Sequence, residues 1–202
     1  MPVVAKGDQF VFGQNLEAVA EFVGLQSTGH TPLPPTVLIR KWIHLLRAAQ
    51  RYVRQIPIER MNERVVENRD RSIRLLSHHV FRIAEAFLEC VMDGVEYRIG
   101  LANLLPQDGT CTTGIEIAHY GDGVIERLQD WGKRLTDQSS RQTVQTFYGP
   151  QTLHALLERS TWHSAQHARE LLHLLERCGI DPDGLLVKAD LAGLPLPERL
   201  FE

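Results

Sequence analysis

Apolar residues recur at steps of three and four along most of the chain, a spacing that predicts amphipathic helices. Gly149 and Pro150 precede the last of these helices, and Gly179 is the glycine expected just after its end. Four long helices of this kind predict an all-α fold, namely an antiparallel four-helix bundle. The four expected helices lie at about 36–55, 72–92, 113–135 and 151–178.

The third of these helices has a recognisable start and a weak middle. Thr112 or Thr113 is the expected N-cap, and Glu116 is placed to complete a capping interaction. Gly121 and Gly123 lower the helix propensity further on. The stretch 95–113 before it is rich in turn residues, so we expect a long irregular connection there.

At 202 residues, the chain has the length of one main domain with short additions. We expect the bundle to occupy residues 31–180 and the proline-containing residues 181–202 to pack over it as a tail. Residues 1–30 differ, because two short apolar runs separated by Gly7 and Asp8 predict a strand, a turn and a second strand before a short helix.

Composition and charge exclude several classes of function. The net charge of -3 gives no positive field for a nucleic-acid backbone. No apolar run is long enough to cross a bilayer, and the N-terminus does not have a signal-peptide pattern, so we expect a cytoplasmic protein that binds no membrane. The three cysteines, Cys90, Cys111 and Cys178, form no Cys-x-x-Cys pair and are expected to be reduced.

Histidine is the unusual component, with nine residues in the chain. His163 and His167 are four residues apart, so a helix places them on one face, one turn from each other. They continue an apolar stripe, and buried imidazoles need a metal, a carboxylate or water to satisfy their ring nitrogens. The pair alone therefore favours ordinary core histidines, with a metal site as the alternative.

The second helix supplies a third candidate ligand. His79 lies three residues after Leu76 and four before Ile83, on the apolar stripe, whereas His78 falls with Arg82 on the side expected to be polar. We therefore predict His79 as the ligand and keep His78 as the alternative. Three histidine nitrogens would leave coordination positions open, as catalytic metal sites require.

Residues 75–88, Leu-Leu-Ser-His-His-Val-Phe-Arg-Ile-Ala-Glu-Ala-Phe-Leu, and residues 162–171, Trp-His-Ser-Ala-Gln-His-Ala-Arg-Glu-Leu, resemble the DinB/YfiT superfamily. The resemblance covers roughly residues 34–178. It implies a metal-binding four-helix bundle with one ligand histidine on the second helix and a His-x-x-x-His pair on the fourth, which correspond to His79, His163 and His167.

The resemblance also implies a function. Members of this superfamily include transferases and isomerases that depend on low-molecular-weight thiols, and a divalent metal would activate such a thiol by lowering its pKa. We expect zinc, with nickel as the alternative metal. The leading hypothesis is a metal-dependent thiol transferase or hydrolase, with a glutathione-like thiol or water as nucleophile, a small electrophilic substrate and a homodimeric assembly.

Two other interpretations remain open at the level of sequence. The protein could be a non-catalytic metal-binding bundle that acts as a structural or interaction protein, or a metal-free bundle with satisfied core histidines. The N-terminal 30 residues resemble the C-terminal part of a glutaredoxin or thioredoxin-like fold without the half that would carry a redox Cys-x-x-Cys. That segment is interpreted as a remnant, a dimer arm or a packing element.

Several further residues are weaker candidates. Cys111 precedes a helix N-terminus, where the dipole would stabilise a thiolate, although an ordinary loop cysteine is the simpler interpretation. Trp162 is interpreted as a packing residue rather than a substrate-stacking one. Polar residues of the third helix could transfer protons, namely His119, Tyr120 and Asp122. Arginines near the start of the second helix could attract an anionic thiol, namely Arg69, Arg71 and Arg74. Positions on the protein surface are the simpler interpretation of both groups.

Overall fold

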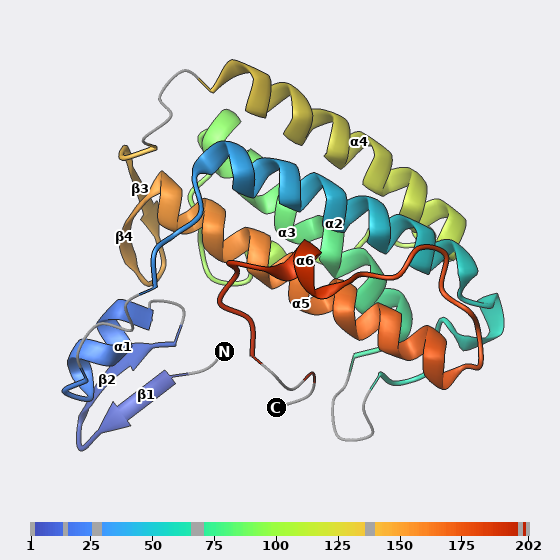
Figure 1. The fold of residues 1–202 in the computed structure, drawn as a ribbon, viewed down its shortest axis with the longest axis horizontal. Helices are drawn as coiled ribbons and strands as arrows, with labels where there is room; N and C mark the ends of the chain where they lie inside the picture. The colour runs from blue at the N-terminus through green and yellow to red at the C-terminus, as the bar shows by residue number, and fades with distance from the viewer. Residues whose placement is uncertain are drawn as a thin grey trace.

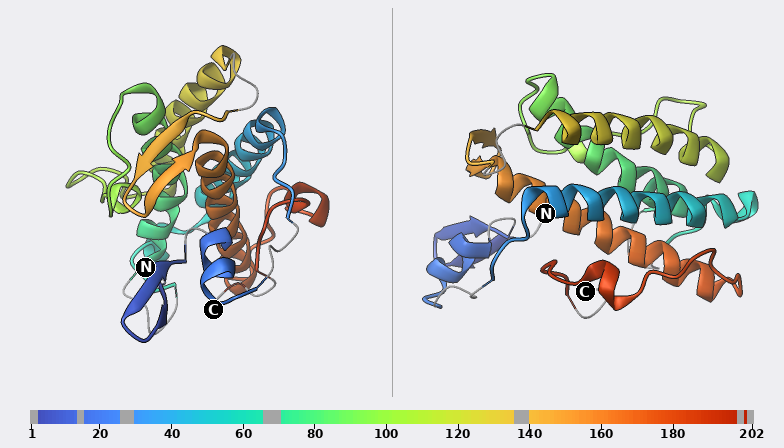
Figure 2. Two further views of the ribbon diagram at one scale, coloured as in Figure 1. Left: turned by 90° about the vertical axis from the view of Figure 1, so that its left-hand side faces the viewer. Right: turned by 45° about the horizontal axis from the view of Figure 1, so that its top comes forward.

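The computed structural model describes residues 3–13, 16–25, 30–65, 71–135, 140–197 and 200. The described part is mostly helical and is built around four long helices that lie side by side (Figures 1 and 2). α2 packs against α4 and α5, and α3 packs against the same two helices. The four helices are α2 (Pro35–Gln55), α3 (Ile73–Met92), α4 (Gly114–Arg134) and α5 (Leu153–Arg177).

α3 and α4 begin close to the predicted residues, and a side chain caps each of them. The Ser72 and Thr113 hydroxyls accept hydrogen bonds from backbone amides of the first turns of α3 and α4. Thr112 also donates its backbone amide and its hydroxyl to the Glu116 carboxylate. Thr113 is therefore the N-cap of α4, and Glu116 completes the capping interaction.

The directions of the helices differ from a fully antiparallel arrangement. α4 runs antiparallel to α2, since Gly114 meets Val53 at one end and Gly132 meets Ile39 at the other. α3 and α4 run in the same direction, as do α2 and α5 (Figure 1). The reason is the long connection after α3, which returns along that helix through η2 (Leu101–Asn103), so that α4 starts at the same end as α3.

Two antiparallel hairpins flank the helices. The N-terminal one pairs β1 (Val3–Lys6) with β2 (Gln9–Phe12) and precedes α1 (Leu16–Phe22), as the sequence predicts. The second pairs β3 (Thr143–Thr146) with β4 (Gly149–Thr152) and was not predicted. The Phe12 and Phe147 rings meet edge to face, with 5.9 Å between their centres, so the two hairpins are in contact.

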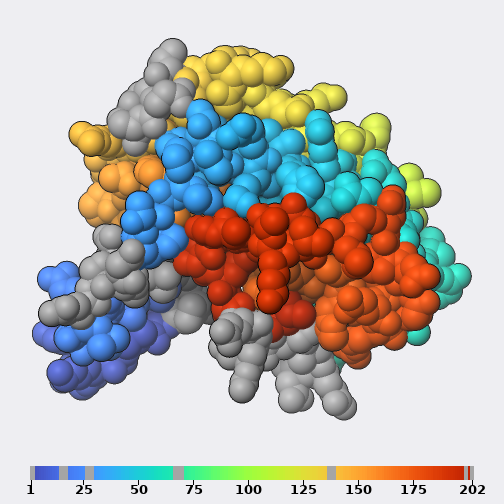
Figure 3. Space-filling view, in the orientation of Figure 1, coloured from blue at the N-terminus to red at the C-terminus, as the bar shows by residue number. Residues whose placement is uncertain are grey.

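The chain after α5 crosses the face formed by α2 and α5 (Figures 1 and 3). The Tyr52 hydroxyl anchors it, because it donates to the Gly184 carbonyl and accepts from the Leu186 amide. The remaining short helices are η1 (Ile58–Arg60) and α6 (Lys188–Leu191). Among the described residues, no helix has the length and apolar character needed to span a membrane.

Candidate metal site

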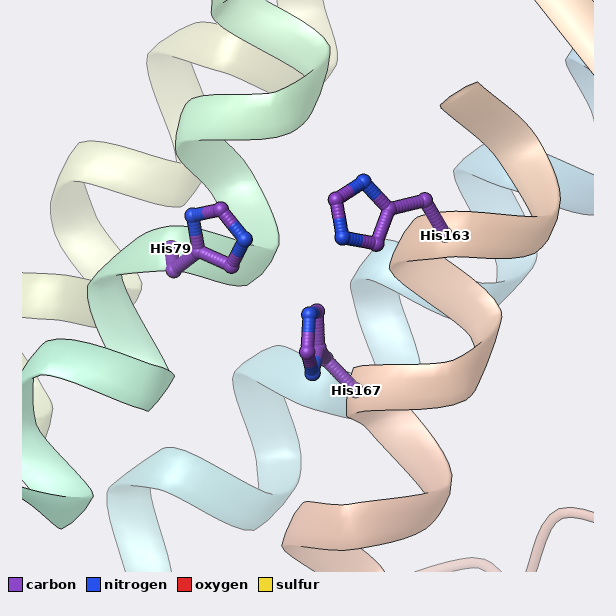
Figure 4. Close-up of side chains that lie close together, drawn as sticks. All are labelled: His79, His163 and His167. Carbon is purple, nitrogen blue, oxygen red and sulfur yellow. The ribbon is translucent and has the colours of Figure 1, made fainter. Parts of the chain in front are cut away.

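Three histidine side chains from two helices point toward one another in the interior (Figure 4). His79 comes from α3, and His163 and His167 come from successive turns of α5. One ring nitrogen of each residue lies within 4.8 Å of the corresponding nitrogen of the other two. The structure therefore brings together the three residues predicted from the sequence, and in the described part of the chain no other His, Cys, Asp or Glu joins this group.

Hydrogen bonds fix the orientation of two of the rings. The Nδ1 atom of His79 lies 2.7 Å from the Ala102 carbonyl oxygen, and the Nδ1 atom of His167 lies 2.7 Å from Oε2 of Glu170. A carbonyl and a carboxylate accept, so both Nδ1 atoms donate, and Nε2 is the nitrogen of each ring that is left to bind a metal. Metal-binding histidines use this arrangement to hold the ligating nitrogen in place.

One ligating nitrogen lacks a partner. The Nε2 atom of His167 is buried and has no hydrogen-bond partner among the described residues. A buried acceptor without a partner is costly, and a divalent cation accepts its lone pair directly. Three imidazole nitrogens that converge in this way fit a borderline metal ion such as zinc or nickel.

The surroundings of His79 and His163 favour the neutral form of these two rings. Burial lowers the pKa of His79 well below its usual value, and the neighbouring His167 and Arg71 lower it further. Burial also lowers the pKa of His163 well below the usual value, with additional contributions from His167 and His79. Imidazoles must be unprotonated to bind a metal, so burial favours the metal-binding form of these two rings.

His78 does not belong to the cluster, and it does not lie on a polar surface either. It is buried, and its ring stacks on Tyr120 of α4 with 4.9 Å between centres. Burial lowers the pKa of His78 to about 4, with Arg82 and Arg74 adding to the effect and Glu85 opposing it. The expectation of a polar side at this position was wrong, because α4 covers this face of α3.

Arg82, which was also expected on the polar side, is buried in an ion-pair network. Its guanidinium makes two hydrogen bonds of 2.7 Å to Glu89 and one of 2.8 Å to Glu85. Its Nε atom donates to the Leu101 carbonyl, next to the Ala102 carbonyl that holds His79. Arg82 therefore fastens η2 against α3 beside the histidines.

The weaker candidates before and on α4 are not part of the histidine cluster. Burial raises the pKa of Cys111, which argues against a stabilised thiolate before α4. His119 is largely exposed, and Asp122 accepts from the Gln50 amide. Tyr120 faces α3, where its hydroxyl donates to Glu85.

The candidate arginines and Trp162 lie in different positions relative to the histidine cluster. Arg71 is close enough to lower the pKa of both His79 and His163, whereas Arg74 acts on His78. Arg69 lies outside the described residues. Trp162 is half-buried, and its ring packs against the Arg159 guanidinium.

Sequence reasoning missed Glu170 and Ala102, the two hydrogen-bond partners of the cluster. The signal for Glu170 was present, because a residue three positions after His167 lies on the same helical face. Ala102 accepts through its backbone carbonyl, which every residue type has, so the sequence could not indicate it.

A scan of protein-family models and a search of curated proteins found no match to this chain.

Proposed function

We propose that this protein is a DinB-like, metal-dependent enzyme, a thiol transferase or hydrolase that acts on a small electrophilic substrate. His79, His163 and His167 would hold the ion, with zinc preferred and nickel as the alternative. A divalent ion supplies Lewis acidity that lowers the pKa of a glutathione-like thiol or of water. The nucleophile would then be available at neutral pH.

The observation that carries the proposal is the convergence of three imidazoles, each with one ring nitrogen that lies within 4.8 Å of those of the other two. Two of the rings are already oriented by Ala102 and Glu170. A structural site is usually closed by four protein ligands, whereas three leave a position for a substrate. This count favours a catalytic role over a purely structural ion.

The family assignment rests on the order of the ligands along the chain. The resemblance to DinB/YfiT proteins implies one histidine on the second long helix and a His-x-x-x-His pair on the fourth. In this chain, α3 and α5 are the second and fourth long helices and carry these residues. The packing of four long helices around the histidines agrees with a bundle of this type.

Metal analysis of purified protein tests the first part of the proposal. We expect one divalent ion for each wild-type chain and almost none for a His163→Ala, His167→Ala double variant. A His173→Ala variant is the matched control, because His173 lies on α5 outside the cluster. Equal metal content in the wild type and the double variant would exclude the site.

Ligand exchange tests whether the site is open. In the cobalt-substituted protein, we expect added glutathione to shift the visible absorption spectrum, because a thiolate would enter the coordination sphere. A metal-loaded protein whose spectrum does not respond to any small thiol or to a change of pH would instead be the non-catalytic bundle.

A further inference from the structure

The candidate metal site is shielded from solvent. His79 and His167 are buried, and Nε2 of His167, the nitrogen left to bind a metal, is closed off from water. His163 is half-buried and is the most exposed of the three ligands, although its Nδ1 atom is also closed off. A metal ion or a substrate therefore has to displace a covering segment on its way to the ligating nitrogens.

The chain after α5, which we call the strap (residues 181–197 and 200), ends on the helix that carries two of the ligands (Figure 1). Gln166 of α5 donates its Nε2 atom to the Leu200 carbonyl at 2.9 Å, and Arg169 donates Nη1 to the Pro197 carbonyl at 2.8 Å. Arg169 also donates to Oε1 of Gln166 at 3.1 Å. Two linked side chains of α5 thus hold the end of the strap.

Gln166 places this end of the strap beside the histidines. It follows His163 by three residues and precedes Glu170 by four, so its side chain is a neighbour of both on the surface of α5. Gln166 is itself half-buried, as His163 is. The end of the strap therefore lies next to the ligand through which the site comes closest to solvent.

The strap is held firmly before its end and weakly at it. Leu194 is buried in the core, and Leu196 packs against it. Beyond Leu196, the printed contacts are hydrogen bonds from side chains to carbonyl oxygens, and the bond to Pro197 is exposed. Local opening occurs at low cost where buried contacts are few. The end of the strap can therefore leave α5 while the rest of the strap stays in place.

The other described segment beside the ligands is held more tightly. η2 supplies the Ala102 carbonyl to His79, and its Leu101 side chain is buried in the core. The Leu101 carbonyl also accepts a buried hydrogen bond from Arg82. Moving η2 would break these buried contacts, so the end of the strap is the segment that opens at the lower cost.

We infer that the end of the strap, which carries Pro197 and Leu200, is a lid that Gln166 and Arg169 hold closed beside the histidine site. It opens to admit a metal ion or a small substrate and closes to exclude water, as lids of enzyme sites do. The inference rests on the proposed function for what enters the site. Loss of the two α5 side chains should change how fast the site is reached while the ligands stay in place.

Chemical labelling of His163 in the metal-free full chain tests the lid. The protein is treated with diethyl pyrocarbonate, and mass spectrometry gives the rate of modification at each histidine. The wild type is compared with a chain that ends at Leu196 and with a Gln166→Leu, Arg169→Met double variant, which keeps the bulk of both side chains. We expect His163 to react at least about fivefold faster in both, the size expected when one or two hydrogen bonds no longer hold the lid closed.

Two other histidines are internal references for this rate. His119 is largely exposed and should react equally fast in all the proteins. His78 is buried outside the cluster and should stay slow. An unchanged rate at His163 in either altered protein would overturn the lid, as would an equal acceleration at His78, because that would mean a general loosening of the fold.

Lys41→Met is the matched control for the double variant. Lys41 also donates to two carbonyls of the strap, those of Ala189 at 3.0 Å and Asp190 at 2.9 Å, but it does so from α2. The variant loses the same charge and contacts of the same kind at another point of the strap. We expect the His163 rate to stay at the wild-type value, and an acceleration equal to that of the double variant would contradict a lid held by Gln166 and Arg169.

Zinc exchange distinguishes failure of the lid from failure of the proposed function. An excess of a chromophoric chelator should remove zinc at least about fivefold faster from the double variant than from the wild type, with the same Kd, because a lid changes entry and exit equally. A weaker Kd with an unchanged rate of zinc entry would make the contacts structural and overturn the lid. If the wild type binds no zinc, the proposed function fails, and the labelling of His163 alone decides the lid.

Discussion

The Nδ1 atom of His167 lies 2.7 Å from Oε2 of Glu170, one turn further along α5. Both side chains are almost fully buried, at 10% and 7% exposure, so water does not compete strongly for this hydrogen bond. The carboxylate fixes the ring so that Nε2 points toward His79 and His163 (Figure 4). A metal held by these residues would depend on Glu170 as well as on its direct ligands.

Replacing Glu170 with Gln should therefore weaken metal binding while leaving the three ligands in place. We expect an affinity loss of about tenfold to a hundredfold, because the neutral amide orients and polarises the imidazole less well. Competition with a chromophoric chelator measures the change. Glu176→Gln is the control, since Glu176 has the same spacing from His173 but is exposed, with 3.5 Å between Nδ1 and Oε2. Equal losses in the two variants would show that net charge, rather than orientation, controls the affinity.

The adjacent histidines of α3 should have separable roles. His79→Ala removes a ligand, so we expect the bound metal to fall to near zero in elemental analysis. His78→Ala leaves the cluster intact but removes a ring stacked on Tyr120, which should lower the free energy of unfolding by about 1–3 kcal/mol with metal still bound. Metal loss in a folded His78→Ala protein, together with retention in His79→Ala, would reverse the assignment.

Arg82 should contribute both to stability and to metal affinity. Arg82→Gln leaves Glu85 and Glu89 without their buried cation, so we expect a loss of about 3–5 kcal/mol in the free energy of unfolding, measured by urea denaturation. It also releases the Leu101 carbonyl next to the His79 partner, which should weaken metal binding. Lys133→Gln, which breaks an exposed pair with Asp130, should leave both the free energy of unfolding and the metal affinity nearly unchanged.

The sequence predicted the helices and the histidine cluster because both depend on periodicity. The apolar stripe that contains Leu76 and Ile83 also contains His79, and the same rule placed His163 and His167 on one face. Periodicity placed His79 on the stripe that carries the cluster, but the polar side that it predicted for His78 was wrong. It identified the stripe that faces α5, but it did not show that α4 covers the neighbouring face.

Other features could not be predicted because they arise from long-range packing. Burial of Arg82 depends on α4 and η2, which contact α3 only in the folded chain. The parallel direction of α3 and α4 follows from the path of the connection, and helix periodicity carries no information on direction. The second hairpin has strands of four residues each, and its Thr143–Thr146 strand lacks a strong apolar alternation, so its signal was weak.

The two glycines in the middle of α4 should respond in opposite ways to replacement by alanine. A Cβ atom at Gly121 would lie 2.7 Å from the Phe81 ring, which is fully buried, so Gly121→Ala should lower the free energy of unfolding by about 1–3 kcal/mol. A Cβ at Gly123 meets nothing within 4 Å among the described residues, and Gly123→Ala should raise that energy by about 0.5–1 kcal/mol through helix propensity. Urea denaturation of both variants measures the difference. A stabilised Gly121→Ala protein would mean that α4 packs less closely on α3 than the Gly121 and Phe81 contact requires.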